Sequence, residues 1–216
     1  MKGRSCLTYL LETLEAWTKA LDNGYGIDAI YLGYRKAFDT VSHARLIEKL
    51  KTYGIGGRML EWIGNFLQDR KMRVRVRSSF SDWIYVLSGV PQGSVLGPLL
   101  FLLFINDLPN WIRNNIRLFA DDTKIWCIIK DKEDQQADLD EMMNWSNKWM
   151  LRFNPDKCTV MHIGHSCDTQ YHMVDNGTSL NMSVTTEKKD LGVCVTNNLK
   201  PSTQCLKTAN KAMVVL

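Results

Sequence analysis

The sequence predicts an α/β (α+β) fold, because runs with a helical period alternate along the chain with apolar, β-prone runs. The chain has 216 residues, of which 45% are hydrophobic, enough for a sizeable core in one domain or in one domain and a fragment. Lys and Arg number 27 against 23 Asp and Glu, a formal net charge of +4. This excess is too small to establish a nucleic-acid partner, but it is compatible with a local basic face.

The cysteine pattern and the hydropathy of the sequence indicate the cellular compartment of the chain. The six cysteines form no CxxC pair and show no regular spacing, and no signal-peptide pattern opens the chain. The longest apolar run, residues 95–105, is about half of the ~20 residues that span a bilayer. We therefore predict reduced thiols, an intracellular location that the sequence does not divide between nucleus and cytoplasm, and no membrane partner.

The first third of the chain carries three helical patterns and one strand pattern. Apolar residues spaced i, i+3, i+4 and i+7 predict an amphipathic helix over residues 6–21. The apolar run at residues 27–33 predicts a central strand that is buried on both faces. Two further helical patterns, at 43–53 and 59–67, are expected to serve structural packing.

Residues 71–77 alternate basic and apolar side chains with period two, which predicts a strand with a row of cations on one face. The row consists of Arg73, Arg75 and Arg77. Such a row is typical of contacts with nucleic-acid phosphates, which position a strand without reading its sequence. The alternative is an exposed edge strand that uses charge against aggregation. Residues 83–87 are expected to form the return strand.

Residues 88–93 are predicted to form a loop whose composition suits ligand contact. Gly89 and Gly93 allow the backbone to approach a ligand closely, and Pro91 fixes the turn. Gln92 offers donors and an acceptor at the tip. A helix is expected from residue 94 to 108, ended by Pro109.

The remaining elements are predicted from the same patterns. We expect hairpin arms at 115–120 and 123–129, a helix over 131–150, a strand at 159–163, a hairpin from residue 170, a strand at 190–195 and a helix from residue 203.

Between the first two arms stand Asp121 and Asp122, so that a tight turn would place both carboxylates at one end of a sheet, where they could share a divalent cation. Taken alone, such a pair more often marks a solvated hairpin corner, because Asp favours turns for local reasons.

Four short motifs follow one another along the chain. They are YLGYRKAFD at 31–39, SGVPQGSVLGP at 88–98, FINDL at 104–108 and FADDT at 119–123, and DLGV follows at 190–193. Together they resemble the motif set of reverse transcriptases of non-LTR (LINE-like) retrotransposons. The resemblance implies a polymerase palm with a central antiparallel sheet packed by helices, partial fingers and an incomplete thumb. It also implies RNA-directed DNA polymerase activity, with an RNA template, a DNA primer, deoxynucleoside triphosphates and Mg²⁺ or Mn²⁺.

The resemblance assigns Asp121 and Asp122 as metal ligands and catalytic residues. The family's first metal-binding aspartate falls at the position that this sequence fills with Gly33, which has no side chain to coordinate a cation. Asp28 is five positions earlier, an odd offset that turns it to the opposite strand face, and Asp39 corresponds to an aspartate that the family has in addition. We therefore expect weakened metal binding and impaired two-metal nucleotidyl transfer.

The resemblance also implies contacts with the incoming nucleotide. Phe38 corresponds to the bulky residue under the nucleotide sugar, with an ordinary core aromatic as the alternative. Tyr34 would offer its backbone carbonyl to a metal, and Pro91, Gln92 and Gly93 would contact the nucleotide and template.

Lys157 matches a catalytic lysine thought to protonate pyrophosphate in related polymerases, with a solvated loop lysine as the alternative. A zinc site built from His162, His165, Cys158 and Cys167 is rejected, because their spacing matches no standard ligand pattern and His162 falls within a strand.

The expected organisation is a remnant of the fingers at 1–26, a palm with inserted fingers helices at 27–165, and the end of the palm and start of the thumb at 166–216. The predicted function is a reverse transcriptase domain with impaired activity, in effect a pseudoenzyme. A noncatalytic nucleic-acid-binding remnant and a decaying copy without a selected role are the alternatives. The sequence does not predict an oligomeric state.

Overall fold

The computed structural model describes residues 5–129, 135–164, 169–175 and 177–215. The chain divides into two compact units. The first comprises Met1–Gly33, Ile112–Glu141 and Asn154–Leu216, and the second comprises Tyr34–Trp111 and Met142–Phe153. No helix within the described ranges is both long and apolar enough to span a bilayer.

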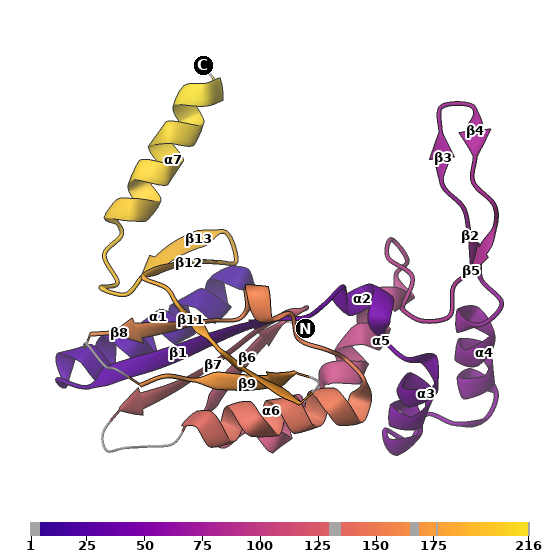
Figure 1. Ribbon diagram of the computed structural model, residues 1–216, viewed down its shortest axis with the longest axis horizontal. Helices are drawn as coiled ribbons and strands as arrows, with labels where there is room; N and C mark the ends of the chain where they lie inside the picture. Colours follow the sequence, from indigo (N-terminus) through magenta and orange to yellow (C-terminus); the bar gives the residue numbers. More distant parts are fainter. Residues whose placement is uncertain (1–4, 130–134, 165–168, 176, 216) are drawn as a thin grey trace. The chain divides into compact units, whose positions relative to one another are not determined.

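The first unit is built on a five-stranded sheet with the order β11-β8-β1-β7-β6 (Figure 1). The strands are β11 (Ser183–Val184), β8 (Thr159–Ile163), β1 (Gly26–Gly33), β7 (Asp122–Ile129) and β6 (Asn115–Phe119). β1 lies at the centre, buried along its length and antiparallel to both neighbours, as the sequence predicts. Only the short β11 pairs in parallel among the described strands of this sheet.

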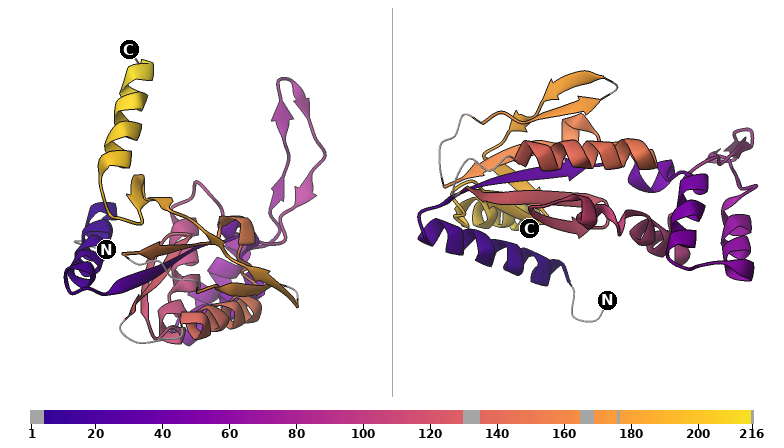
Figure 2. Two further views of the ribbon diagram at one scale, coloured as in Figure 1. Left: turned by 60° about the vertical axis from the view of Figure 1, so that its left-hand side comes forward. Right: turned by 90° about the horizontal axis from the view of Figure 1, so that it is seen from below.

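Helix α1 (Cys6–Asp22) covers one face of this sheet, as Figure 2 shows. The side chain of Ser5 caps its first turn by accepting from the Thr8 N–H at 3.1 Å. Trp17 and Ala20 pack on the side chains of β1 that share a strand face with Gly33, together with residues of β7 and β8. The apolar periodicity of residues 6–21 therefore predicts both the helix and its buried side.

The C-terminal part of the first unit holds two hairpins and a helix. They are β9 (His172–Asp175) with β10 (Thr178–Asn181), β12 (Glu187–Asp190) with β13 (Val193–Thr196), and α7 (Ser202–Val215). The single strand predicted over 190–195 is wrong. Leu191 and Gly192 have φ values of 46° and 94°, so the chain turns there and its two sides pair with each other.

The second unit is mainly helical. It contains α2 (Ala37–Thr40), α3 (His43–Thr52), α4 (Gly57–Leu67), α5 (Leu96–Ile105) and the 3₁₀ helix η1 (Leu108–Trp111). The helix predicted to run to residue 108 ends at Ile105, and Pro109 lies within η1 rather than after a helix. A proline is tolerated there because the first turn of a helix leaves its N–H groups without helical partners.

A long hairpin also belongs to the second unit, and it extends away from α3 and α4 in Figures 1 and 2. Its ladders join β2 (Lys71–Met72) to β5 (Ile84–Tyr85) and β3 (Arg75–Val76) to β4 (Ser79–Phe80). The continuous strand predicted over 71–77 is therefore interrupted, and Arg77 lies in the turn with φ of 56°.

Helix α6 (Gln135–Trp149) contributes residues 135–141 to the first unit and 142–149 to the second. It matches the helix predicted over 131–150, although residues 131–134 lie outside the described residues. The 3₁₀ helix η2 (Pro155–Lys157) follows and leads into β8.

Candidate active site

Asp121 and Asp122 lie at the tip of the β6–β7 hairpin in the first unit. Phe119 and Asp122 form the last cross-strand pair, so Ala120 and Asp121 make a two-residue turn. Ala120 adopts φ of 51°, the left-handed conformation that such a turn demands. The tight hairpin predicted from the sequence is thus present, and it brings two adjacent carboxylates to one end of the central sheet.

Gly33 pairs directly with Asp122 at the end of β1. Lys157 occupies the space beside Gly33: a Cβ atom at position 33 would lie 3.0 Å from Lys157 Cβ and 3.3 Å from Lys157 Cδ. The backbone fixes this approach, because the Asn154 N–H, just before η2, donates to the Gly33 carbonyl at 2.7 Å. The aliphatic stem of Lys157 thus lies close enough that a side chain at position 33 would have to displace it by a few tenths of an ångström.

Desolvation and several neighbouring charges shift the pKa of Asp122. Although Asp122 is an exposed residue, nearby protein atoms partly desolvate its carboxylate, and this raises its pKa. Asp121 and Asp190 raise the pKa further, whereas Lys188 and Lys157 lower it. Lys188 Nζ also donates to the Lys157 carbonyl at 3.2 Å, which holds the second lysine at the same edge. Two lysines therefore supply positive charge beside the paired carboxylates.

The glycine-rich loop predicted at 88–93 is tied to the segment around Asp39 in the second unit. The Gly89 N–H donates to Val41 O at 2.8 Å, and the Ser88 hydroxyl donates to Asp39 O at 2.8 Å. A Cβ at position 89, where φ is 89°, would come within 2.7 Å of the Asp39 backbone, so only glycine fits. Gln92 is exposed and donates to Asp39 Oδ1 at 3.3 Å.

Two aromatic residues of the second unit also belong to the expected nucleotide site. Phe38 is half-buried and stacks on the buried Phe101, with ring centroids 4.5 Å apart. Tyr34 is buried and its ring stacks on Phe153, with ring centroids 4.6 Å apart. Pro91 and Gly93 flank Gln92 at the tip of the loop.

Residues 7–199 match the family described as reverse transcriptase (RNA-dependent DNA polymerase). The chain belongs to this family. The family resemblance inferred from the sequence motifs is therefore confirmed.

The relatives come from non-LTR retrotransposons. Over 193 residues the chain is 31% identical to the RNA-directed DNA polymerase from mobile element jockey of Drosophila funebris, covering 84% of this chain and 21% of that protein. Over 174 residues it is 32% identical to a probable RNA-directed DNA polymerase from transposon BS of Drosophila melanogaster, covering 72% and 18%. The chain thus spans about one fifth of the length of these relatives.

Among solved structures, an apo telomerase from Candida tropicalis, truncated from its C-terminal domain, has the same fold. The TM-score is 0.62 at 12% identity, and the match covers 90% of this chain and 39% of that one. The predicted fold class, a palm-like α/β arrangement around a central sheet, is confirmed.

The acidic side chains near Asp121 and Asp122 do not fit a site that bridges two metal ions. No three His, Cys, Asp or Glu side chains are grouped for a metal anywhere in the described part of the chain. Asp28, on the opposite face of β1, is buried and bonds instead to His162 Nδ1 at 2.5 Å and to the Tyr171 hydroxyl at 2.7 Å. Asp121 and Asp122 remain as the paired carboxylates of the turn, with Lys157 and Lys188 nearby, while the neighbouring Asp190 is held in an ion pair with Lys124.

His162, which the spacing of the sequence excludes as a zinc ligand, has a different role in the structure. Its hydrogen bond to Asp28 joins β8 to β1, where the two residues pair directly. His165 and Cys167 lie outside the described residues.

Sequence reasoning missed two charged residues near the site, Lys124 and Asp190. They form an ion pair with side-chain exposures of only 2% and 7%. The available signal was a lysine within the otherwise apolar run after the FADDT motif, since a charge in a buried strand requires a partner. Its partner lies far along the chain, at the first residue of the DLGV motif, so spacing alone did not reveal it.

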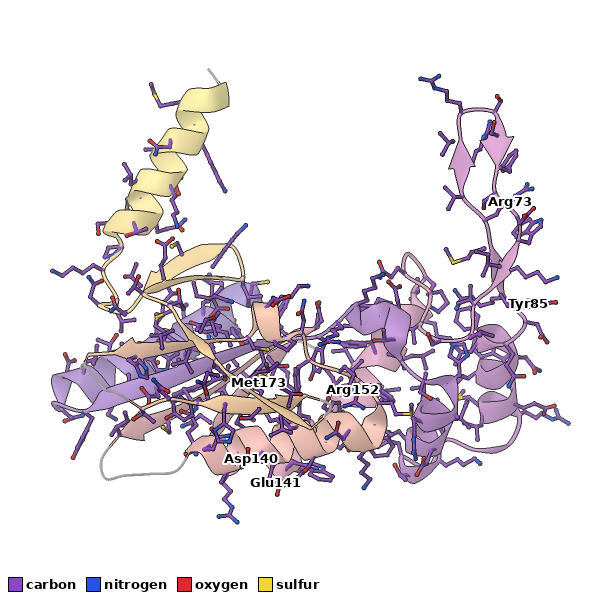
Figure 3. All side chains as sticks on the ribbon, in the orientation of Figure 1. Arg73, Tyr85, Asp140, Glu141, Arg152 and Met173 are labelled. Atoms are coloured by element: carbon purple, nitrogen blue, oxygen red, sulfur yellow. The ribbon has the colours of Figure 1, made fainter. Side chains whose placement is uncertain are left out.

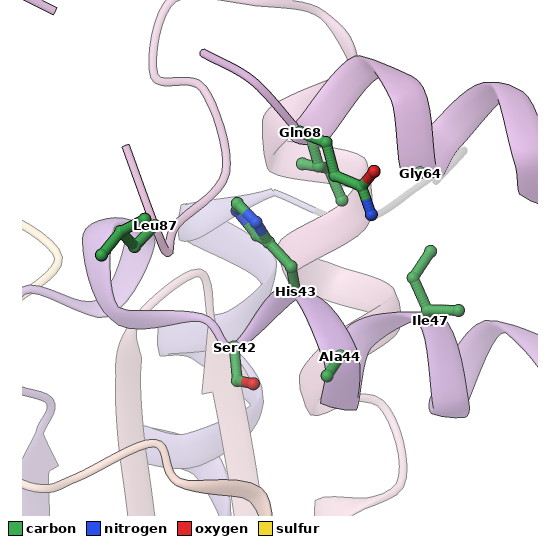
Figure 4. Close-up of a pocket in the computed structure, with 8 residues that line it drawn as sticks. Ser42, His43, Ala44, Ile47, Gly64, Gln68 and Leu87 are labelled. Atoms are coloured by element: carbon green, nitrogen blue, oxygen red, sulfur yellow. The ribbon is translucent and has the colours of Figure 1, made fainter. Parts of the chain in front are cut away.

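The second unit also contains a cavity of about 590 Å³ between α3 and α4, next to the base of the long hairpin (Figure 4). Its lining residues are Ser42, His43, Ala44, Ile47, Gly64, Leu67, Gln68 and Leu87. His43 Nε2 is 2.8 Å from Gly89 O, so this side chain connects the cavity wall to the glycine-rich loop. None of the residues expected to contact a nucleotide is among the lining residues.

Proposed function

We propose that this chain is the polymerase domain of a non-LTR retrotransposon reverse transcriptase in which nucleotidyl transfer on a primed RNA template is strongly impaired. The observation that carries the proposal is the geometry around Gly33. This residue is the direct neighbour of Asp122 across the sheet, it has no carboxylate, and the stem of Lys157 lies over it. Polymerase chemistry requires acidic ligands that bridge the metal ions, and two adjacent carboxylates provide too few.

The proposal gives the remaining residues their roles. Asp121 and Asp122 hold Mg²⁺ or Mn²⁺ only weakly, and Lys157 is placed to donate a proton to pyrophosphate, as its motif position suggests.

The proposal further assigns the Tyr34 carbonyl to a metal contact at the nucleotide site. It assigns Phe38, Pro91, Gln92 and Gly93 to contacts with a deoxynucleoside triphosphate. Residues 27–165 form the palm with its inserted helices in this scheme. The template is RNA and the primer is DNA.

Primer extension on a primed RNA template tests the proposal. The unmodified chain is compared with Gly33→Asp, and with Gly33→Ala, which adds the same Cβ beside Lys157 without a carboxylate. We expect extension by Gly33→Asp to exceed that of the other two by about 100-fold or more, because a group that stabilises charge in the transition state contributes about 10² to 10³ in rate. Extension by the unmodified chain at the level of Gly33→Asp contradicts the proposed impairment.

A noncatalytic nucleic-acid-binding role is the second candidate, and the hairpin that carries Arg73 and Arg75 favours it. Both arginines are exposed. This candidate predicts that the unmodified chain binds RNA, whereas neither Gly33→Asp nor Gly33→Ala extends a primer.

A further inference from the structure

The long hairpin of the second unit contains a one-residue bulge that changes which side chains share a face. Its tip ladder pairs Arg75 with Phe80, and its base ladder pairs Lys71 with Tyr85. Between the two ladders the outgoing strand has two residues, 73–74, whereas the return strand has three, 81–83. An extra residue on one strand shifts the alternation of its side chains by one position.

The bulge places the three rings of the hairpin on the same face as three of its cations. Without the extra residue, Trp83 and Tyr85 would point to the face opposite Phe80; with it, all three share a face with Lys71, Arg73 and Arg75. We call this set the cation–aromatic face. The other face carries the aliphatic side chains Met72, Val74, Val76 and Ile84.

Contacts along the cation–aromatic face agree with this register. Lys71 Nζ lies 4.5 Å from the Tyr85 ring centroid. Arg73 Cζ lies 3.9 Å from the Phe80 centroid and 4.5 Å from the Trp83 centroid, between two rings. Arg75 Cζ lies 5.4 Å from the Phe80 centroid. Figure 3 shows Arg73 and Tyr85 at separate levels of the same hairpin.

The rings are open to solvent to an extent unusual for large aromatic side chains. Phe80, Trp83 and Tyr85 keep 49%, 57% and 56% of their surface exposed. Lys71, Arg73 and Arg75 are exposed as well, and within the described ranges none of the three forms a salt bridge with a carboxylate. Cation–π contact holds the guanidinium groups against the rings without consuming their charge, so they remain available to an anion.

We propose that the cation–aromatic face binds single-stranded nucleic acid, with Arg73 and Arg75 on the phosphates and Trp83, Phe80 and Tyr85 stacking on unpaired bases. A duplex presents phosphates but hides its base faces, so it would engage the cations alone. A single strand offers both phosphates and open base faces, the two groups that the cations and the exposed rings of this face can bind. The inference rests on the proposed function in one respect, that the ligand is a polynucleotide.

The test uses the whole chain and fluorescence anisotropy, without nucleotides or divalent metal. The probes are a labelled 15-nucleotide oligouridine RNA, an RNA of the same length in a perfect duplex, and a single-stranded oligomer of the same charge with abasic sites. We expect the single strand to bind about ten-fold more tightly than either the duplex or the abasic oligomer. The slope of log affinity against log salt should be about −1.4, since the phosphate contacts of Arg73 and Arg75 each contribute about −0.7 on a single strand.

Three variants assign the effect to the face. Trp83→Leu should weaken binding to the single strand by about ten-fold and leave duplex binding unchanged, because it removes a stacking surface and no charge. Arg73→Gln should weaken binding to all three probes and reduce the salt slope by about 0.7. Val74→Thr, a substitution of similar size on the aliphatic face of the same hairpin, should change neither. Thermal melts of each variant confirm that the fold is kept.

Several outcomes would overturn the inference: equal affinity for the single strand and the abasic oligomer, an unchanged affinity in Trp83→Leu, or an equal loss in Val74→Thr. Failure of the proposed function is distinguishable, because binding is measured without polymerisation. If Gly33→Asp fails to extend a primer while the probe preferences hold, only the proposed polymerase activity is contradicted.

Discussion

Lys49 is the most confined cation of the second unit among the residues described. Its side chain is 2% exposed, and its ammonium donates to Asp107 and to the Phe104 carbonyl. The rings of Phe104, Trp145 and Trp149 surround the same ammonium, with centroids 4.8, 4.6 and 4.0 Å away. Burial lowers the pKa of Lys49 to about 8, against the opposing effect of Asp107. The FINDL motif thus includes the carboxylate that makes a buried lysine tolerable.

Lys49 should make stability depend on pH in a defined direction. Its folded pKa of about 8 lies below the unfolded value of 10.5, so the unfolded state binds more protons between these values and the unfolding free energy rises with pH. From pH 7 to pH 9 this contribution should amount to about 1 kcal/mol. Urea unfolding of the unmodified chain and Lys49→Met at both pH values measures it. An equal pH dependence in the two proteins would contradict the assignment.

The pKa of Asp122 shows whether the carboxylates of the candidate site interact. Its pKa is raised by desolvation first and by Asp121 second, so Asp121→Asn should lower the pKa of Asp122 while leaving it above the ordinary range. Carbon-13 NMR titration of the carboxyl group reads this directly. Lys188→Ala should shift the pKa in the opposite direction, because Lys188 lowers it. A pKa that responds to neither change would show that the charges are screened from one another.

At the scale of the elements, the ion pair between Lys124 and Asp190 connects β7, which carries Asp122, to the β12–β13 hairpin. Lys124 also lies over the rings of Tyr9, Trp17 and Tyr31, at 4.9, 5.0 and 5.6 Å from their centroids. Burial lowers the pKa of Lys124, and the Asp190 charge opposes this shift. A buried charge that loses its partner is costly, whereas an apolar replacement of both partners is often tolerated.

A double-mutant cycle compares the loss of one partner of this ion pair with the replacement of both. Asp190→Leu alone should lower the unfolding free energy by about 3 kcal/mol, because the Lys124 ammonium is left unpaired. The double variant Lys124→Met with Asp190→Leu should recover most of that loss, as measured by urea unfolding. The matched control is the exposed pair of Arg45 and Glu48, where Glu48→Ala should cost less than about 0.5 kcal/mol. Additive effects of the two buried substitutions would contradict the coupling.

The elements also show where local patterns predict structure and where they do not. The helix at α1 and the central strand β1 were predictable, because burial imposes a period on their side chains. The turn at Leu191 and the bulge opposite Arg73 were not, because both depend on which strand pairs with which. The spacing of apolar residues predicts neither the left-handed φ at Leu191 nor the extra residue on the return strand.

At the scale of the whole molecule, the order of the motifs was sufficient to predict the family and the palm-like sheet. The same motifs also led to the prediction, which remains a prediction, that Asp121 and Asp122 are metal ligands and that Gly33 replaces a third. The approach of Lys157 to Gly33 was not predictable, because it depends on a backbone hydrogen bond between segments far apart in the chain. Long-range contacts of this kind determine how much space surrounds a glycine such as Gly33.

The contact between Lys157 and Gly33 leads to a prediction about the binding of divalent cations, which can be measured without catalysis. In Gly33→Asp, a third carboxylate joins Asp121 and Asp122 and displaces the Lys157 stem by a few tenths of an ångström. Without a cation the three charges repel one another, so the melting temperature should fall below that of Gly33→Ala.

Added Mg²⁺ should reverse this loss in Gly33→Asp alone. At ten times a Kd of about 1 mM, binding to the folded state adds about 1.4 kcal/mol, or roughly 3 to 6 °C for a chain of this size. The unmodified chain and Gly33→Ala should shift by less than about 1 °C, since binding much weaker than this leaves the equilibrium nearly unchanged. Differential scanning calorimetry with Mg²⁺, and with Na⁺ at matched ionic strength, separates binding from screening. An equal shift in all three proteins would mean that Asp121 and Asp122 bind the cation without help from position 33.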